Sequence, residues 1–142
     1  MRRSSNINNL IALDTNVFIY YLQKHPKYGP VVHEYFHSIL AKKGEFITSN
    51  ITLIEVLAFS STDFSADYLK RKLLDIDSLK IVPLSNEIAI EAAKIRREYQ
   101  FSLPDAVQLA TAVLNQAQVF ITNDKNLKRF KKLKVQLISE IK

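Results

Sequence analysis

Short apolar segments alternate with segments of helical period along the whole chain. The residues from Leu10 to Leu13 are all apolar and stop at Asp14, which predicts a short buried strand. Four further strands are predicted, at 46–48, 79–84, 119–122 and 135–138. Helices are predicted between them, at 16–23, 31–43, 51–59, 63–75, 86–99, 105–116 and 126–133. Strands that alternate with helices favour an α/β fold with a mostly parallel five-stranded sheet.

The length of 142 residues suits one domain, and no linker rich in Pro, Gly or Ser divides the chain. We therefore expect a single domain over residues 10–142, preceded by a flexible, polar extension over residues 1–9. Proline and glycine residues should determine where several helices begin or end. Pro26, Gly29 and Pro30 should separate two helices, and Pro104 suits the first turn of another. Asn86 is the expected N-cap of the helix that follows it.

The residues that the chain lacks exclude several kinds of site. There are no cysteines, which excludes a disulfide framework, thiolate zinc sites and cysteine catalysis. The two glycines, Gly29 and Gly44, are far apart in the sequence. This excludes a Walker A loop and the glycine-rich dinucleotide-binding turn, because both need clustered glycines to bring backbone N–H groups onto phosphate.

The charge balance favours a polyanionic partner. The net charge is +6 and the sequence pI is about 9.5. Lysine and arginine side chains displace counterions from phosphates, so nucleic acid is the first candidate. The apolar stretches are far shorter than the roughly 20 residues of a membrane span, and the basic start of the chain lacks the pattern of a signal peptide. We expect a cytoplasmic protein with no membrane partner.

Four acidic residues occupy places where parallel α/β sheets bind ligands. Asp14 follows the first predicted strand, and Asp124 follows the fourth. Glu55 and Asp105 lie in the first turns of predicted helices. Strand C-termini and the next helix N-termini share one edge of such a sheet, so we expect the four carboxylates to converge there. Each also has a structural interpretation: Asp14 and Asp124 as N-caps, Glu55 in a capping box with Thr52, and Asp105 as a partner of the helix dipole.

A cluster of four like charges needs a counterion. Two carboxylates about 4 Å apart repel by about 4 kcal/mol at an effective dielectric constant near 20. Mg²⁺ and Mn²⁺ prefer oxygen ligands and would neutralise such a cluster. A carboxylate-bound metal on a basic protein suggests metal-assisted phosphodiester hydrolysis.

The chain resembles the PIN-domain ribonucleases, and among them the toxins of the VapBC toxin–antitoxin type. The resemblance extends from about Leu10 to Ile138. It is carried by four segments, at 13–16 (LDTN), 52–57 (TLIEVL), 103–112 (LPDAVQLATA) and 120–124 (FITND). Many relatives have a glycine near the position of Gln100, so the turn there is expected to differ.

The resemblance implies a three-layer α/β/α domain with a five-stranded parallel sheet. It implies a Mg²⁺- or Mn²⁺-dependent endoribonuclease that leaves a 5′-phosphate and a 3′-hydroxyl. It also implies an antitoxin protein as partner and a homodimer. Carried over by position, the catalytic and metal-binding residues are Asp14, Glu55, Asp105 and Asp124, and the supporting residues are Asn16, Thr122 and Arg96. An RNA-processing nuclease without an antitoxin is an alternative, and so is a nucleic-acid-binding module that does not cut.

A basic segment begins directly after Asp124. Its six basic side chains are not interrupted by an acid, and they are Lys125, Lys128, Arg129, Lys131, Lys132 and Lys134. The functional interpretation is contact with the RNA backbone, and the structural alternative is a solvated basic face.

Two further patterns have competing interpretations. His33, Glu34 and His37 fit the HExxH pattern of zinc peptidases, but no later histidine supplies a third ligand. The alternative is a pair of surface histidines on a helix. The residues at 17–22 are apolar all round. They either pack a helix against the sheet or offer a second apolar face to a dimer partner or an antitoxin.

Overall fold

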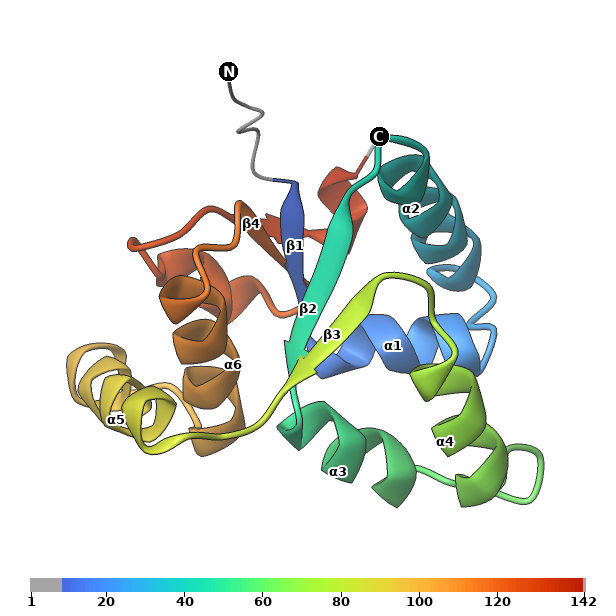
Figure 1. Cartoon of the computed structure of the whole chain (residues 1–142), viewed down its shortest axis with the longest axis horizontal. Coiled ribbons are helices and arrows are strands. Elements are labelled where there is room, and N and C mark those ends of the chain that lie inside the picture. The colour runs from blue at the N-terminus through green and yellow to red at the C-terminus, as the bar shows by residue number, and fades with distance from the viewer. Residues whose placement is uncertain (1–8, 142) are drawn as a thin grey trace.

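A five-stranded, fully parallel sheet lies at the centre of the protein (Figure 1). The structure is a computed structural model that describes residues 9–141. The strand order is β3-β2-β1-β4-β5. The strands are β1 (Leu10–Leu13), β2 (Glu45–Ser49), β3 (Leu79–Val82), β4 (Val119–Thr122) and β5 (Val135–Leu137). The predicted parallel α/β sheet is confirmed.

Helices cover both faces of the sheet and produce three layers. Figure 1 shows α1 (Thr15–Leu22), α2 (Gly29–Ala41) and α4 (Ala66–Leu74) on one side, and α5 (Asn86–Tyr99) and α6 (Leu103–Leu114) on the other. The remaining helix, α3 (Ile51–Ala58), follows β2. Two short 3-10 helices, η1 (Lys125–Arg129) and η2 (Ile138–Glu140), flank β5.

The side-chain alternation of the central strands divides the core into two halves. Ile11 and Leu13 of β1 pack with α1 and α2, whereas Ala12 between them packs with α5 and α6. In β4, Ile121 and Phe120 divide in the same way. Because successive side chains of a strand point to opposite faces, a strand that is apolar at every position must be covered on both sides. The all-apolar runs of the sequence therefore dictate the three-layer fold.

Short polar side chains determine where the helices begin. Ser65, Ser85 and Ser102 cap α4, α5 and α6 by accepting hydrogen bonds from backbone N–H groups. The prediction that Asn86 caps α5 is wrong, because Ser85 takes that place. Pro104 lies in the first turn of α6, as predicted.

Several predicted element ends move by a few residues. Gly29 and Pro30 do not precede α2 but form its first turn, where the missing N–H of proline costs nothing. The predicted helix at 126–133 is only the 3-10 helix η1, and the strand predicted at 79–84 stops before Pro83. Gln100 ends α5 with φ of 61°, a left-handed conformation that favours glycine.

The predicted flexible extension over residues 1–9 lies outside the described residues, apart from Asn9. The carbonyl of Asn9 accepts a hydrogen bond from the backbone N–H of Glu45 at 2.9 Å. Between residues 9 and 141, none of the helices combines the length and apolar character needed to cross a membrane.

Candidate active site

The four predicted acidic residues lie at the carboxyl edge of the sheet and influence one another. Asp14 follows β1 and begins α1, and Asp124 follows β4 and begins η1. Glu55 lies in α3, and Asp105 lies in the first turn of α6. The charges of Asp105 and Glu55 both raise the pKa of Asp14, and those of Asp124 and Glu55 both raise the pKa of Asp105. We call these four residues the acidic edge.

Asp14 is the buried member of the acidic edge. Its side chain is only 7% exposed, and each carboxylate oxygen accepts one hydrogen bond. Oδ1 accepts from the backbone N–H of Thr15 at 2.8 Å, and Oδ2 accepts from the hydroxyl of Thr122 at 2.6 Å. Burial raises the pKa of Asp14 to about 7 despite these bonds, and the nearby acids add to the increase. A carboxylate that costs this much to ionise is suited to a site that receives a cation.

Thr122 joins the two strands that carry Asp14 and Asp124. Its hydroxyl donates to Asp14 and accepts from the backbone N–H of Asp124 at 3.1 Å. Asp124 in turn accepts from the N–H of Asn126 at 2.9 Å, as an N-cap does. Both aspartates therefore have the capping role that the sequence suggested, and the same bonds fix their positions at the edge.

Asp105 is more exposed than Asp14. Burial raises its pKa, the hydrogen bond with Ser102 opposes this shift, and the charges of Asp124 and Glu55 add to it. Burial is the largest cause of the raised pKa, and the negative charge along the edge adds to it. No cation is among the groups that shift the pKa of Asp105.

Glu55 is held by a hydroxyl from another helix rather than by a capping box. The hydroxyl of Thr15 donates to Oε1 of Glu55 at 2.6 Å. Helix α3 has no side-chain cap, so the expected capping box of Thr52 with Glu55 does not form. The physical reason is that Thr52 is fully buried and its hydroxyl faces Thr15 and Thr48 instead.

A buried polar network lies behind Glu55, and the sequence analysis missed it. Its members are at most 6% exposed, and they are Thr15, Thr48, Ser49, Thr52 and Gln108. The only sequence signal was a glutamine among the mostly apolar residues that follow Asp105, at the fourth position of DAVQLATA. Thr48 and Ser49 end β2, Thr52 lies in the first turn of α3, and Thr15 begins α1. Gln108 comes from α6.

Asn16 and Arg96, the two other residues that the resemblance implied as supporting ones, form no hydrogen bond or ion pair with the acidic edge within residues 9–141. The Oδ1 atom of Asn16 is buried and accepts no hydrogen bond from any residue between 9 and 141. Such an atom two residues after Asp14 is available to a water molecule or a hydrated ion. Arg96 is exposed and donates from Nε to the carbonyl of Phe101 at 3.2 Å. It therefore stabilises the turn between α5 and α6.

The donors at the acidic edge fit a hard divalent cation. All are carboxylate, amide or hydroxyl oxygens, which Mg²⁺ and Mn²⁺ prefer. Among the described residues, no three side chains of His, Asp or Glu are close enough to enclose an ion by themselves. Mg²⁺ does not need such a cage, since it usually keeps several waters and uses one or two carboxylates.

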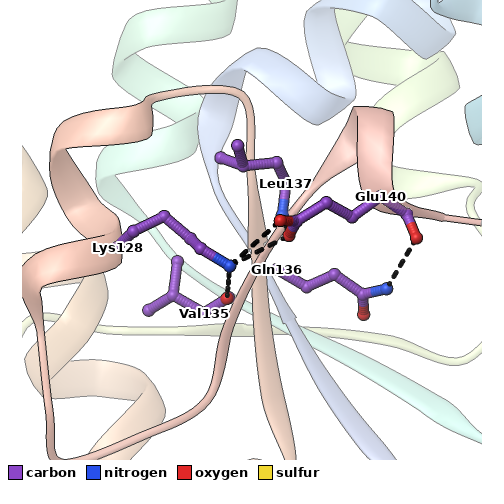
Figure 2. A network of polar contacts seen from close by, with 5 residues as sticks. All are labelled: Lys128, Val135, Gln136, Leu137 and Glu140. Carbon is purple, nitrogen blue, oxygen red and sulfur yellow. Dashed lines mark hydrogen bonds and ion pairs between the residues drawn. The ribbon is translucent and has the colours of Figure 1, made fainter.

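Figure 2 shows how the basic segment is attached to the C-terminal end of the described chain. Lys128 donates from Nζ to both carboxylate oxygens of Glu140, at 3.0 and 3.1 Å, and to the carbonyl of Val135 at 3.3 Å. Glu140 also accepts from the backbone N–H of Leu137 at 2.9 Å. Lys128 therefore has a structural contact within the protein.

The other basic side chains divide into two groups. Lys132 pairs with Glu98 at 3.2 Å and Glu91 at 3.8 Å, and Arg129 donates to the carbonyl of Tyr99 at 3.0 Å. Lys125, Lys131 and Lys134 are exposed, and their ammonium groups form no hydrogen bond or ion pair within residues 9–141. Only part of the segment is therefore free to meet a phosphate backbone.

The two side patterns of the sequence have structural explanations. His33 is exposed on α2, and its ring stacks on Tyr21 with centroids 4.1 Å apart. No third zinc ligand joins His33 and His37 among the described residues, so the zinc-peptidase alternative has no support. The second face of α1 is also partly covered, because Tyr21 contacts Phe36 of α2.

Comparisons with known proteins identify the family. The PIN domain family matches residues 11–133. No curated protein sequence matches the chain. Among solved structures, VapBC2 of Rickettsia felis bound to promoter DNA aligns with a TM-score of 0.72 and 22% identity, over 90% of this chain and 98% of that one. A toxin–antitoxin complex of Klebsiella pneumoniae aligns with a TM-score of 0.71 and 25% identity, over 92% of this chain and 99% of that one. DNA-bound VapBC of Salmonella typhimurium aligns with a TM-score of 0.70 and 19% identity, over 93% of this chain and 99% of that one. The chain therefore belongs to the PIN domain family.

Proposed function

We propose that this protein is a Mg²⁺- or Mn²⁺-dependent endoribonuclease and the VapC-type toxin of a toxin–antitoxin pair. The observation that carries the proposal is the meeting of four carboxylates along one sheet edge, where Asp14 is buried and Asp105 interacts with each of the other three. Membership of the PIN domain family and the oxygen donors of the edge support it.

In this proposal the cation would be held by the four carboxylates of the acidic edge, those of Asp14, Glu55, Asp105 and Asp124. A divalent ion held there would supply an activated water for attack on phosphorus and would neutralise charge on the phosphate. Thr122 and the N–H of Thr15 fix the Asp14 carboxylate, so its geometry is set before substrate arrives. Asn16 is proposed to support the edge through its unpaired amide oxygen.

We propose RNA as the substrate because of the net charge of +6 and the free ammonium groups of Lys125, directly after Asp124, and Lys131, within the same basic segment. Lys128, Arg129 and Lys132, which make contacts within the protein, would contribute less to binding. RNA and an antitoxin would both be met in the cytoplasm, which is the compartment that we propose.

We propose a small antitoxin protein as partner, because the similar structures are toxin–antitoxin complexes. A homodimer is also proposed. Ile54 of α3 and Ile90 of α5 are 69% and 72% exposed and offer apolar surface to a second copy. A single domain over residues 10–142 is part of the same proposal. A processing nuclease without an antitoxin would have the same site, but its expression alone would not arrest growth.

The test is cleavage of total cellular RNA by purified protein with Mg²⁺, with Mn²⁺ and with EDTA. We expect cleavage only with a divalent ion, and a rate at least about 100-fold lower for Asp105→Asn. Asp67→Asn is the matched control, because Asp67 also lies in the first turn of a helix but is exposed and paired with Arg71 at 3.7 Å. Cleavage that resists EDTA, or full activity of Asp105→Asn, would contradict the proposal.

A further inference from the structure

We infer that Gln108 is a positioning residue that acts through Thr15 to fix the Glu55 carboxylate at the acidic edge. The effect on metal binding rests on the proposed function. The positioning itself rests on contacts within the described residues, in which the Gln108 amide donates to the Thr15 hydroxyl and this hydroxyl donates to Glu55.

The orientation of the Gln108 amide is determined by a backbone group. The N–H of Ser49 can only donate, and it lies 3.2 Å from Oε1 of Gln108. The carbonyl oxygen of the amide must therefore face Ser49. Its NH₂ group must then face the other way, toward Thr52 at 2.8 Å and Thr15 at 3.2 Å.

This orientation sets the direction of the hydroxyl bonds. Thr52 and Thr15 each accept one amide hydrogen from Gln108. Thr52 can then donate to Thr48 at 2.7 Å, and Thr48 can donate to the carbonyl of Leu13 at 2.9 Å. Each hydroxyl uses its one hydrogen once, so this assignment satisfies the network. Two longer contacts lie within it, from the Thr48 hydroxyl to Oε1 of Gln108 at 3.3 Å and between the hydroxyls of Thr15 and Thr52 at 3.2 Å.

The consequence falls on Glu55. The Glu55 carboxylate can only accept, so the single hydrogen of the Thr15 hydroxyl is directed to Oε1 of Glu55, at the short distance of 2.6 Å. The bond that Thr15 accepts from Gln108 holds this hydroxyl in place from the other side. Nothing among residues 9–141 donates to the other oxygen of Glu55, Oε2. One oxygen is thus anchored from behind, and the other is left for the edge. Supporting groups of this kind are worth roughly 10–100-fold in metal affinity or activity.

A second buried threonine provides a matched control. Thr111 lies one turn after Gln108 on α6 and is 1% exposed. Its hydroxyl donates to the carbonyl of Val107 at 2.7 Å, within its own helix. Thr111→Val therefore removes a buried hydroxyl from the same helix without touching the path to Glu55.

The test compares Thr15→Val, Thr15→Ser, Gln108→Met and Thr111→Val with wild-type protein. Mn²⁺ affinity is measured by titration calorimetry, and kcat and KM are measured for RNA cleavage. We expect Thr15→Val and Gln108→Met to weaken Mn²⁺ binding by about tenfold and to lower kcat rather than raise KM. Thr15→Ser keeps the hydroxyl and should restore affinity to within about twofold. Thr111→Val should bind Mn²⁺ like the wild type.

Crystal structures of Thr15→Val and Gln108→Met distinguish the two possible failures. A displaced Glu55 carboxylate supports the positioning role even if wild-type protein binds no Mn²⁺, a result that would contradict the proposed function alone. A Glu55 carboxylate that stays in place in both variants, with wild-type Mn²⁺ affinity, would overturn the inference. Thermal melts identify any variant that fails to fold. If Gln108→Met fails to fold, Thr15→Val still tests the inference.

Discussion

The acidic edge and the basic segment at 125–134 both adjoin the end of β4, yet their charges are held in opposite ways. Asp14 is 7% exposed, and two hydrogen bonds fix its carboxylate. Lys128 and Glu140 each keep 43% of the side chain exposed. Charges interact strongly where water is excluded and weakly where water surrounds them.

The comparison teaches that the density of charge in the sequence does not indicate where electrostatic energy is concentrated. Six basic residues lie within ten positions, and half of them pair with carboxylates or carbonyls that hold the C-terminal part of the domain together. The four acids are scattered over the chain, but the sheet topology brings them to one edge.

The largest expected effect is a dependence of stability on pH that comes from Asp14. Its pKa rises from 3.8 to about 7 on folding, so the folded state keeps a proton that the unfolded chain loses. The free energy of unfolding should therefore fall as pH rises from about 4 to about 7, by about 4 kcal/mol in total. Denaturant unfolding in EDTA at about pH 4.5 and about pH 8 should show about 3 kcal/mol of this change, since part of it lies below pH 4.5.

Asp14→Asn cannot ionise at this position, so its stability should change much less over the same range. A divalent ion added at about pH 8 should raise the stability of wild-type protein, because it binds the folded state alone. Equal pH dependence of the two proteins would show that Asp14 does not carry the strained charge of the acidic edge.

An intermediate effect is expected in RNA binding, where the free and the paired lysines should differ. In an Asp105→Asn background, the change of Lys125 and Lys131 together to alanine should reduce the salt dependence of RNA affinity by about 1.4 in logarithmic slope. The change of Lys128 and Lys132 to alanine should reduce it less, because those ammonium groups are paired within the protein. Affinity is measured by fluorescence anisotropy from about 50 to about 200 mM salt. If the two double variants show the same salt dependence of RNA affinity, the free and the paired lysines do not differ in their contact with RNA.

The smallest effect should follow the loss of the ion pair shown in Figure 2. Lys128→Met keeps the length of the side chain and removes the bond to Glu140. Because the pair is exposed, the melting temperature should fall by less than about 3 °C. Scanning calorimetry measures the change. A much larger fall would mean that the C-terminal attachment is a major source of stability.

Much of the fold could be predicted because its signals are local. The apolar runs at 10–13 and 119–122 are too apolar for anything but strands covered on both sides, and the structure places both at the centre of the sheet. The position of the four acids at one edge followed from the order of strands and helices. The exact ends of the helices could not be predicted in the same way. Pro30 can either precede a helix or lie in its first turn, and Ser85 and Asn86 are both suitable N-caps.

The buried network could not be predicted because its partners are remote in sequence. Thr15, Thr52 and Gln108 lie on three different helices, and both residue types are found mostly at the surface of proteins. The pairing of Lys132 with Glu98 was hidden for the same reason. Periodicity shows which face of a helix is buried, but it does not show which distant polar group meets it.

The measurement that tests the central claim most directly is the location of Mn²⁺ by anomalous diffraction from crystals soaked in its salt. The account predicts a peak within about 2.0–2.5 Å of carboxylate oxygens of Asp14 and Asp105. A matched crystal of Asp14→Asn should lose that peak. A peak beside His33 and His37 instead, or no peak at the acidic edge in wild-type crystals, would contradict the assignment of the acidic edge as the metal site of a nuclease.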